Sequence, residues 1–339
     1  MTRRPSMQPI AHSSLSRRSM LLGGAALAAM SGLAGTARAA DWPDKPLRLI
    51  VPFPPGGTTD FVTRLIGTKV GQSVGQAAIV ENKPGAGTVI GVDFVAKSAP
   101  DGYSYVCVAG SFCVNSVLVK HLPYDSLRDL RPVAMMGASD QALAVYPGSG
   151  LKSLADLKKA ALANPGKLSY GSFGVGTTPH LAGEMLKQQM GGLDITHIPY
   201  KGQGPALTDL LGGHTTMMFG TWLDLRDLVQ AGKLVVLGMA TDKRSRFAPD
   251  VPTMREQGYD IVSATWAGLL APAKTPDDVV MRMNQEVNKA LALPDVIAAF
   301  DKNSTEAMPG TPQQFAAYIQ SEIAKYRKVI ETAHISAQG

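Results

Sequence analysis

The stretch formed by residues 47–64 constrains the fold of this chain more than any other. Residues 47–51 are a short apolar run, typical of a buried strand. Residues 52–57 cannot extend that strand, because the prolines lack the N–H that a sheet requires and the glycines allow positive φ. Thr58 or Thr59 then suits a helix N-cap, with Asp60 in the first turn. A strand, a glycine turn and a helix start form a site for an anion, since the first N–H groups of a helix have no partner within it.

The same pattern returns in the middle of the chain. Residues 168–173 are strand-like, Gly174 and Gly176 form a turn, and the Thr177-Thr178-Pro179 sequence can start a helix. The tripeptide Gly-Thr-Thr occurs at residues 57–59 and again at residues 176–178. We therefore predict two facing helix-end sites, one in each domain, that hold a small anionic ligand between them.

The order of predicted elements indicates an α/β protein of two domains. Strands and helices alternate over residues 47–109 and again over residues 154–240, as in open, mainly parallel sheets flanked by helices. Two extended segments, 131–145 and 261–270, are predicted crossings between the domains. We predict one domain from residues 40–140 and 265–339, and the other from 141–264. A short helix is expected at 252–258, and the helices at 276–292 and within 312–334 should cover the first sheet.

The first 39 residues are predicted to be an export signal. A basic start precedes the apolar run 20–34, and Ala37-Arg38-Ala39 fits a cleavage site, which implies a periplasmic protein. The Arg17-Arg18 pair fits a twin-arginine signal, and an ordinary Sec signal is an open alternative. The first 40 residues hold five arginines and no acid, so their removal leaves 28 Lys and Arg against 27 Asp and Glu. The nearly neutral remainder gives no support for a nucleic-acid partner.

Several segments, taken in order along the chain, resemble one known family: the solute-binding receptors of tripartite tricarboxylate transporters, also called Bug receptors. The segments that carry the resemblance are residues 43–57, 81–87, 180–184, 199–202, 209–213, 249–253 and 268–272. The resemblance implies a two-domain periplasmic-binding-protein fold of type II, the Venus flytrap. It also implies a carboxylate ligand, held by residues 54–60 and 171–178 and delivered to a membrane permease.

The candidate ligand-binding residues come from the two loops and from strand ends. They are Phe53, Pro54, Gly57, Thr58, Thr59, Asp60, Ser111, Ser172, Gly174, Gly176, Thr177, Thr178 and Trp222. Asp60 could cap its helix, bind a ligand hydroxyl or water, or act as a catalytic base. Trp222 could stack on the ligand or pack at the hinge or core. Lys201 could pair with a carboxylate or be an ordinary surface lysine.

No catalytic residue, cofactor or metal is expected. His180 and Glu184 lie four apart, a spacing that can bind zinc, but a third ligand at a defined spacing is missing. The alternative is a histidine that hydrogen-bonds a loop carbonyl. The glycine turns do not match the spacing of nucleotide-binding loops. Cys107 and Cys113 could form a disulfide or be small buried hydrophobes.

The favoured function is an extracytoplasmic receptor that captures a small carboxylate and acts as a monomer. Tricarboxylates, dicarboxylates, amino acids and aromatic acids all fit two helix-end sites. An exported enzyme with a bound cofactor and a receptor that feeds a signalling partner are the alternatives.

Overall fold

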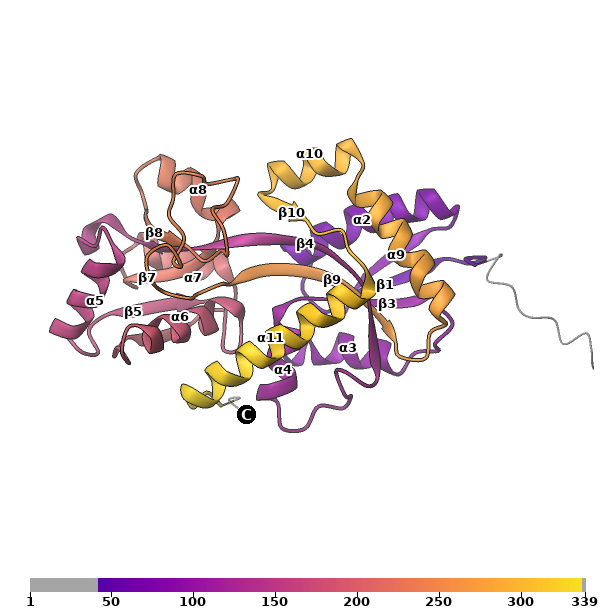
Figure 1. Ribbon diagram of the computed structural model, residues 1–339, viewed down its shortest axis with the longest axis horizontal. Coiled ribbons are helices and arrows are strands. Elements are labelled where there is room, and N and C mark those ends of the chain that lie inside the picture. Colours follow the sequence, from indigo (N-terminus) through magenta and orange to yellow (C-terminus); the bar gives the residue numbers. More distant parts are fainter. Residues whose placement is uncertain (1–41, 337–339) are drawn as a thin grey trace, which may run out of the picture. The chain divides into compact units, whose positions relative to one another are not determined.

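The computed structural model describes residues 42–336, and those from Pro43 onward form one compact unit (Figure 1). The predicted export signal and its cleavage site lie outside the described residues. Within the compact unit two groups of elements, here called the first and second lobes, share one ten-stranded sheet. The fold is the two-domain α/β arrangement that we predicted. The residue limits of the two domains stay a prediction.

The first lobe is built from the two ends of the described chain. It contains the three parallel strands β1 (Leu47–Val51), β2 (Ala78–Asn82) and β3 (Ser104–Val108), and the short strand β10 (Thr305–Ala307). Its helices are α2 (Thr58–Val74), η3 (Ala86–Thr88), α3 (Val89–Ala96), α4 (Gly110–Leu118), α9 (Asp277–Leu291), α10 (Pro294–Lys302) and α11 (Pro312–Thr332).

The second lobe is built from the middle of the chain. Its strands are β5 (Ser169–Ser172), β6 (Thr196–Pro199), β7 (Met217–Thr221) and β8 (Val235–Met239). Its helices are η4 (Pro147–Ser149), α5 (Leu154–Ala163), α6 (Thr178–Gln189), α7 (Gln203–Leu211) and α8 (Trp222–Gln230). Strand β5 pairs with β6 and β7 in parallel, as the alternation of elements predicted.

Two long strands run side by side from one lobe to the other: β4 (Leu130–Val145) and β9 (Ala264–Pro272) (Figure 1). Strand β4 pairs with β9 as far as Asp140, and from Gln141 onward it pairs with β7 in the second lobe. Strand β4 occupies the predicted extended segment 131–145, and β9 occupies the predicted segment 261–270 from Ala264 onward. Hydrogen bonds continue through the junction, so the lobes are joined by sheet rather than by loose linkers.

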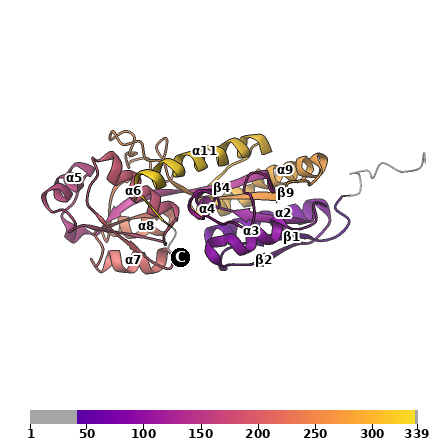
Figure 2. The same ribbon diagram turned by 90° about the horizontal axis from the view of Figure 1, so that it is seen from below.

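The C-terminal helices cover the first sheet, as predicted. Helix α9 buries Val279, Met283 and Val287 at helical spacing, and it packs on β4 and α2. Helix α11 starts with a capping box formed by Thr311 and Gln314. In Figure 2, α11 runs along β4 and α4, and it also contacts α6 of the second lobe.

One local prediction was wrong, and three elements were missed. Residues 252–258 do not form a helix, and 254–258 form turns: Thr253 and Glu256 make the reciprocal bonds of a helix start, but Gly258 at φ 89° ends the segment within one turn. Helices α4 and α10 were not predicted. Strand β10 was also missed, because three residues are too few to show an alternating pattern.

Both cysteines are buried and free, so the disulfide alternative is wrong in this structure. Burial raises the pKa of the Cys107 thiol to about 12. Among residues 42–336 no helix combines the length and the apolar character needed to cross a membrane.

Candidate functional site

The main candidate site is a cavity of about 610 Å³ between the lobes, here called the interlobe cavity. Both Gly-Thr-Thr segments reach it. Eight of the thirteen predicted residues line it, and they come from both lobes: Phe53, Pro54, Gly57, Thr58, Thr59, Ser111, Thr177 and Thr178. The five that do not are Asp60, Ser172, Gly174, Gly176 and Trp222.

Five helices begin at the interlobe cavity. The N-cap residues of α2, α4, α6, α7 and α8 all line it, and they are Gly57, Ala109, Thr177, Gly202 and Thr221. In each helix the first backbone N–H groups have no partner within the helix, and the helix dipole adds partial positive charge there. The cavity therefore gathers N–H donors and positive potential from both lobes, which suits an anion.

The first loop, residues 52–57, is held in place by the side chain of Asp60. The carboxylate of Asp60 accepts hydrogen bonds from the Gly56 N–H (3.0 Å), the Asn82 amide (2.8 Å) and Arg64. Asn82 also donates to the Phe53 carbonyl at 3.0 Å. Burial alone would raise the pKa of Asp60, but the bonds from Arg64, Gly56 and Asn82 outweigh it, and the pKa is lowered. Asp60 thus holds the loop in shape as an anion, a role that differs from the three considered, namely helix capping, ligand binding and catalysis.

The second loop, residues 173–177, is held by short polar contacts of its own. Gly174 and Gly176 both have positive φ. The Thr177 hydroxyl donates to the Gly174 carbonyl at 2.7 Å, and the Ser172 hydroxyl accepts from the Gly174 N–H at 3.2 Å. Ser172, Gly174 and Gly176 therefore set the course of the loop, whereas Thr177 and Thr178 line the interlobe cavity.

A neutral aromatic cluster lies under the second loop. His180 Nδ1 accepts a hydrogen bond from the Gly176 N–H at 3.1 Å, and the His180 ring stacks on His197 with centroids 3.9 Å apart. His197 Nε2 lies 2.6 Å from the Ser172 hydroxyl. Burial lowers the pKa of His180 to about 4, with a smaller contribution from Lys187, and that of His197 to about 3. Both rings are neutral at pH 7.

The zinc alternative for His180 and Glu184 finds no support in the described part of the chain. No group of His, Cys, Asp and Glu between residues 42 and 336 could hold a metal ion. The Glu184 carboxylate instead accepts from the Tyr170 hydroxyl (2.6 Å) and Lys187 (2.8 Å). The expectation that His180 bonds a loop carbonyl was also wrong, since its ring accepts from a loop N–H.

Trp222 lies in the core of the second lobe, and its indole N–H donates to the Phe247 carbonyl at 3.0 Å. Of the two alternatives left open for this residue, the structure favours packing.

The sequence did not predict Gln203 and Asp224 as site residues, and it left open whether Lys201 pairs with a carboxylate. Lys201, Gln203 and Asp224 line the interlobe cavity, and Gln203 donates a hydrogen bond to Asp224 at 2.5 Å. Apolar surface comes from Phe61, Phe173 and Leu223. Lys201 and Gln203 flank Gly202 at the start of α7, a glycine turn after a strand that could have been recognised by the same rule as the two loops.

A buried polar network joins the interlobe cavity to the crossing strands. Gln141, fully buried, donates to the hydroxyls of Thr178 (3.0 Å) and Thr265 (3.1 Å), and it accepts from the Ser263 hydroxyl (2.7 Å). Thr178 and Thr265 both line the cavity. The N-terminal end of α6 is thus hydrogen-bonded to β4, and through Gln141 to β9, at the junction of the lobes.

A two-lobed α/β fold with an anion-suited cavity between the lobes defines a periplasmic binding protein of type II. The family model described as "Tripartite tricarboxylate transporter family receptor" matches residues 62–335, and the chain belongs to that family.

Individual proteins and solved structures are also similar to this chain over most of its length. Protein BugT of Bordetella pertussis is 35% identical over 305 residues, covering 89% of this chain and 93% of BugT. The structure "R. palustris Rpa4515 with adipate" is 32% identical, with a TM-score of 0.78 and coverage of 87% of this chain and 99% of that chain. The structure of MatC (Rpa3494) from Rhodopseudomonas palustris with bound malate is 28% identical, with a TM-score of 0.74 and coverage of 85% and 100%.

Proposed function

We propose that this protein is an extracytoplasmic receptor that binds a small carboxylate in the interlobe cavity and delivers it to the membrane permease of a tripartite tricarboxylate-type transporter. The observation that carries the proposal is the convergence of five helix N-termini from both lobes on one cavity. Two similar proteins whose structures hold adipate and malate support the ligand class.

Each lobe supplies part of the binding groups. From the first lobe, the ends of α2 and α4 offer N–H groups and the hydroxyls of Thr58 and Ser111. From the second lobe, the ends of α6, α7 and α8 offer N–H groups, the hydroxyl of Thr177 and the charge of Lys201. A ligand that engages both sets favours the state in which the lobes are close, because only that state makes all of the contacts. The closed form is then what the permease recognises.

The proposed function requires export and no covalent chemistry. Residues 1–39 would direct the chain to the periplasm and be removed near Ala39. Two titratable groups at the loops, Asp60 and His180, are occupied by the hydrogen bonds that fix those loops. That arrangement supports binding rather than catalysis.

A thermal-shift screen tests the proposal. The exported protein is purified, partly unfolded and refolded to remove carried-over ligand, and then melted with adipate, malate, citrate, glutamate, nicotinate and benzoate. A ligand at about 100 times its Kd adds about 2.7 kcal/mol of stability, which raises the Tm by a few degrees. Sugars and nucleotides are the controls. If no acid raises the Tm while a nucleotide or a metal does, the proposal fails.

A further inference from the structure

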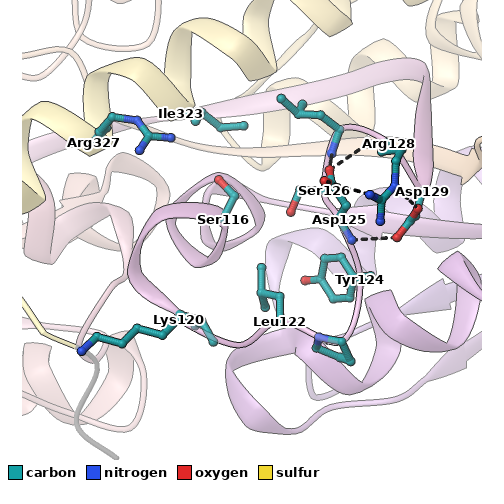
Figure 3. Close-up of a pocket in the computed structure, with 13 residues that line it drawn as sticks. Ser116, Lys120, Leu122, Tyr124, Asp125, Ser126, Arg128, Asp129, Ile323 and Arg327 are labelled. Carbon is teal, nitrogen blue, oxygen red and sulfur yellow. Dashed lines mark hydrogen bonds and ion pairs between the residues drawn. The ribbon is translucent and has the colours of Figure 1, made fainter.

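A second cavity, of about 490 Å³, lies in the first lobe and shares no lining residue with the interlobe cavity. It is lined by the C-terminal end of α4, the segment 119–129 and the middle of α11, and we call it the α4–α11 cavity (Figure 3). Its volume is within the range of small-molecule sites. The function proposed above makes no use of it.

Two buried hydroxyls point into this cavity. Tyr124 is 6% exposed and Ser126 is 7% exposed, and neither hydroxyl has a hydrogen-bond partner among the described residues. Figure 3 shows both oxygens directed toward the open space beside Leu122. A buried hydroxyl without a partner costs stability, so both groups favour an occupant with acceptor oxygens. Burial raises the pKa of Tyr124, which keeps its hydroxyl protonated and able to donate.

The two acidic residues of the segment 119–129 accept hydrogen bonds from the backbone of the same segment. Asp125 accepts from the N–H groups of Leu127 and Arg128, each at 3.0 Å. Asp129 accepts from the Asp125 N–H at 2.8 Å and from Arg128 Nε at 3.1 Å. The same bonds, from the Asp125 N–H and then Arg128, lower the pKa of Asp129. The segment is therefore a fixed wall, with the charge of Arg128 balanced locally.

Two further cations at the cavity are not balanced in this way. Lys120 at the end of α4 and Arg327 on α11 both line it, and neither has an acidic partner among residues 42–336. In Figure 3 the Arg327 guanidinium lies across the space from the hydroxyls of Tyr124 and Ser126, whereas the Lys120 amine is directed away from that space. An exposed cation alone is ordinary on a protein surface. Here Arg327 stands across a cavity from two buried donors that need acceptors.

We propose that the α4–α11 cavity is a second ligand site, which takes a small organic acid with a further acceptor oxygen. The carboxylate faces Arg327, and the second oxygen accepts hydrogen bonds from Tyr124 and Ser126. The body of the ligand lies against the apolar side chains of Leu122 and Ile323. A dicarboxylate or a hydroxy acid has this chemistry, whereas a simple monocarboxylate lacks the second acceptor.

Methyl-detected NMR of the exported, ligand-stripped protein tests this site separately from the interlobe cavity. The Ile323 methyl reports on the α4–α11 cavity, and the Leu223 methyl reports on the interlobe cavity. The probes are adipate and 4-hydroxybenzoate, each paired with the analogue that lacks the second acceptor, hexanoate or benzoate. We expect at least one probe to move the Ile323 signal in a saturable way, and its analogue to bind at least tenfold more weakly at that reporter.

Conservative variants complete the test. Tyr124→Phe combined with Ser126→Ala removes only two hydroxyls, and Arg327→Gln changes an exposed side chain. Each should raise the midpoint at Ile323 about tenfold or more and leave the response of Leu223 unchanged. Thr58→Ala should do the opposite. If Ile323 stays still with all probes, or if the variants leave its midpoint unchanged, the hydroxyls are served by water alone and the proposal is overturned. Movement of Ile323 without Leu223 would support this site and count against the interlobe proposal.

Discussion

The two loops that face the interlobe cavity contain the same tripeptide, yet they are stabilised by different chemistry. The first loop is held by an anion: Asp60 draws together the Gly56 N–H, Asn82 and Arg64. The second is held by neutral groups, with His180 and Ser172 bonding its backbone and His197 stacked behind. A loop that presents helix N–H groups to an anionic ligand can therefore be held in place either by a charged carboxylate or by neutral groups. The two loops should differ in their response to acid and to substitution.

Low pH should cause the largest difference between the two loops, because it should destabilise the second loop before the first. His180 has its pKa lowered to about 4, so the unfolded chain takes up a proton below about pH 6.5 that the folded chain does not. The resulting stability is present above that pH and is lost as the pH falls toward 4. From pH 7 to pH 5 the loss from His180 alone should be about 2 kcal/mol, with more below. The lowered pKa of Asp60 keeps the first loop intact until more acidic pH.

Urea unfolding between pH 7 and pH 4.5 measures this effect. His180→Asn keeps an acceptor for the Gly176 N–H but cannot titrate, so its stability should fall less steeply with pH than that of the wild type. Equal slopes for the two proteins would show that His180 does not hold the second loop as a neutral acceptor.

Asp60→Ala should destabilise the protein by about 2 kcal/mol, because it leaves the Gly56 N–H and the Asn82 amide without their acceptor. The matched control is Arg64→Gln, which removes a partner that is 48% exposed and should cost at most about 1 kcal/mol. Chemical denaturation compares the two variants. A larger loss for Arg64→Gln would mean that the ion pair, not the loop contacts, is what matters.

Gly110→Ala tests the contact between the lobes. A Cβ at Gly110, at the start of α4, would lie 2.4 Å from the Thr178 methyl of α6, whose hydroxyl is held by Gln141. Overpacking of this kind should cost about 1–2 kcal/mol. Gly204→Ala is the control, because its Cβ would have no neighbour within 4 Å and an alanine favours a helix. The two variants are compared by thermal denaturation. Equal Tm values for Gly110→Ala and Gly204→Ala would contradict the proposed close contact between the lobes.

Lys201→Gln should have the smallest effect. Lys201 is exposed at the interlobe cavity, so we expect the affinity for a bound carboxylate to fall by a factor of about five or less, about 1 kcal/mol. The loss should shrink in high salt, which screens exposed charges. Titration calorimetry at two salt concentrations checks this. A loss of more than a hundredfold would make Lys201 a principal anchor and the helix ends secondary.

Much of the architecture could be predicted because it depends on local patterns. The glycine turns at 52–57 and 174–176 each follow a strand and precede a helix, so the place of the two helix starts on the interlobe cavity followed from chain geometry. The crossings were recognisable as long extended runs. Helix α4 was missed because its Gly110-Ser111 start resembled the end of a strand turn.

The partners of buried polar groups could not be predicted in this way. Asp60 meets Asn82 and His180 stacks on His197 only because the fold brings separate strands and helices together. The start of α8 joins the other helix ends for the same reason. Trp222 was a candidate because it follows a strand, but its direction depends on the packing of Phe247 and the rest of the second-lobe core.

The central claim is that one carboxylate is held by both lobes at once. It is tested most directly by titrating the ligand-stripped protein with the acid of largest thermal shift, beginning with adipate. Thr58→Ala removes a hydroxyl from the first loop and Thr177→Ala one from the second. We predict that each weakens binding about tenfold, and that Thr208→Ala, outside the cavity lining, changes nothing. If one loop variant abolishes binding while the other has no effect, the ligand rests on a single lobe and the claim is wrong.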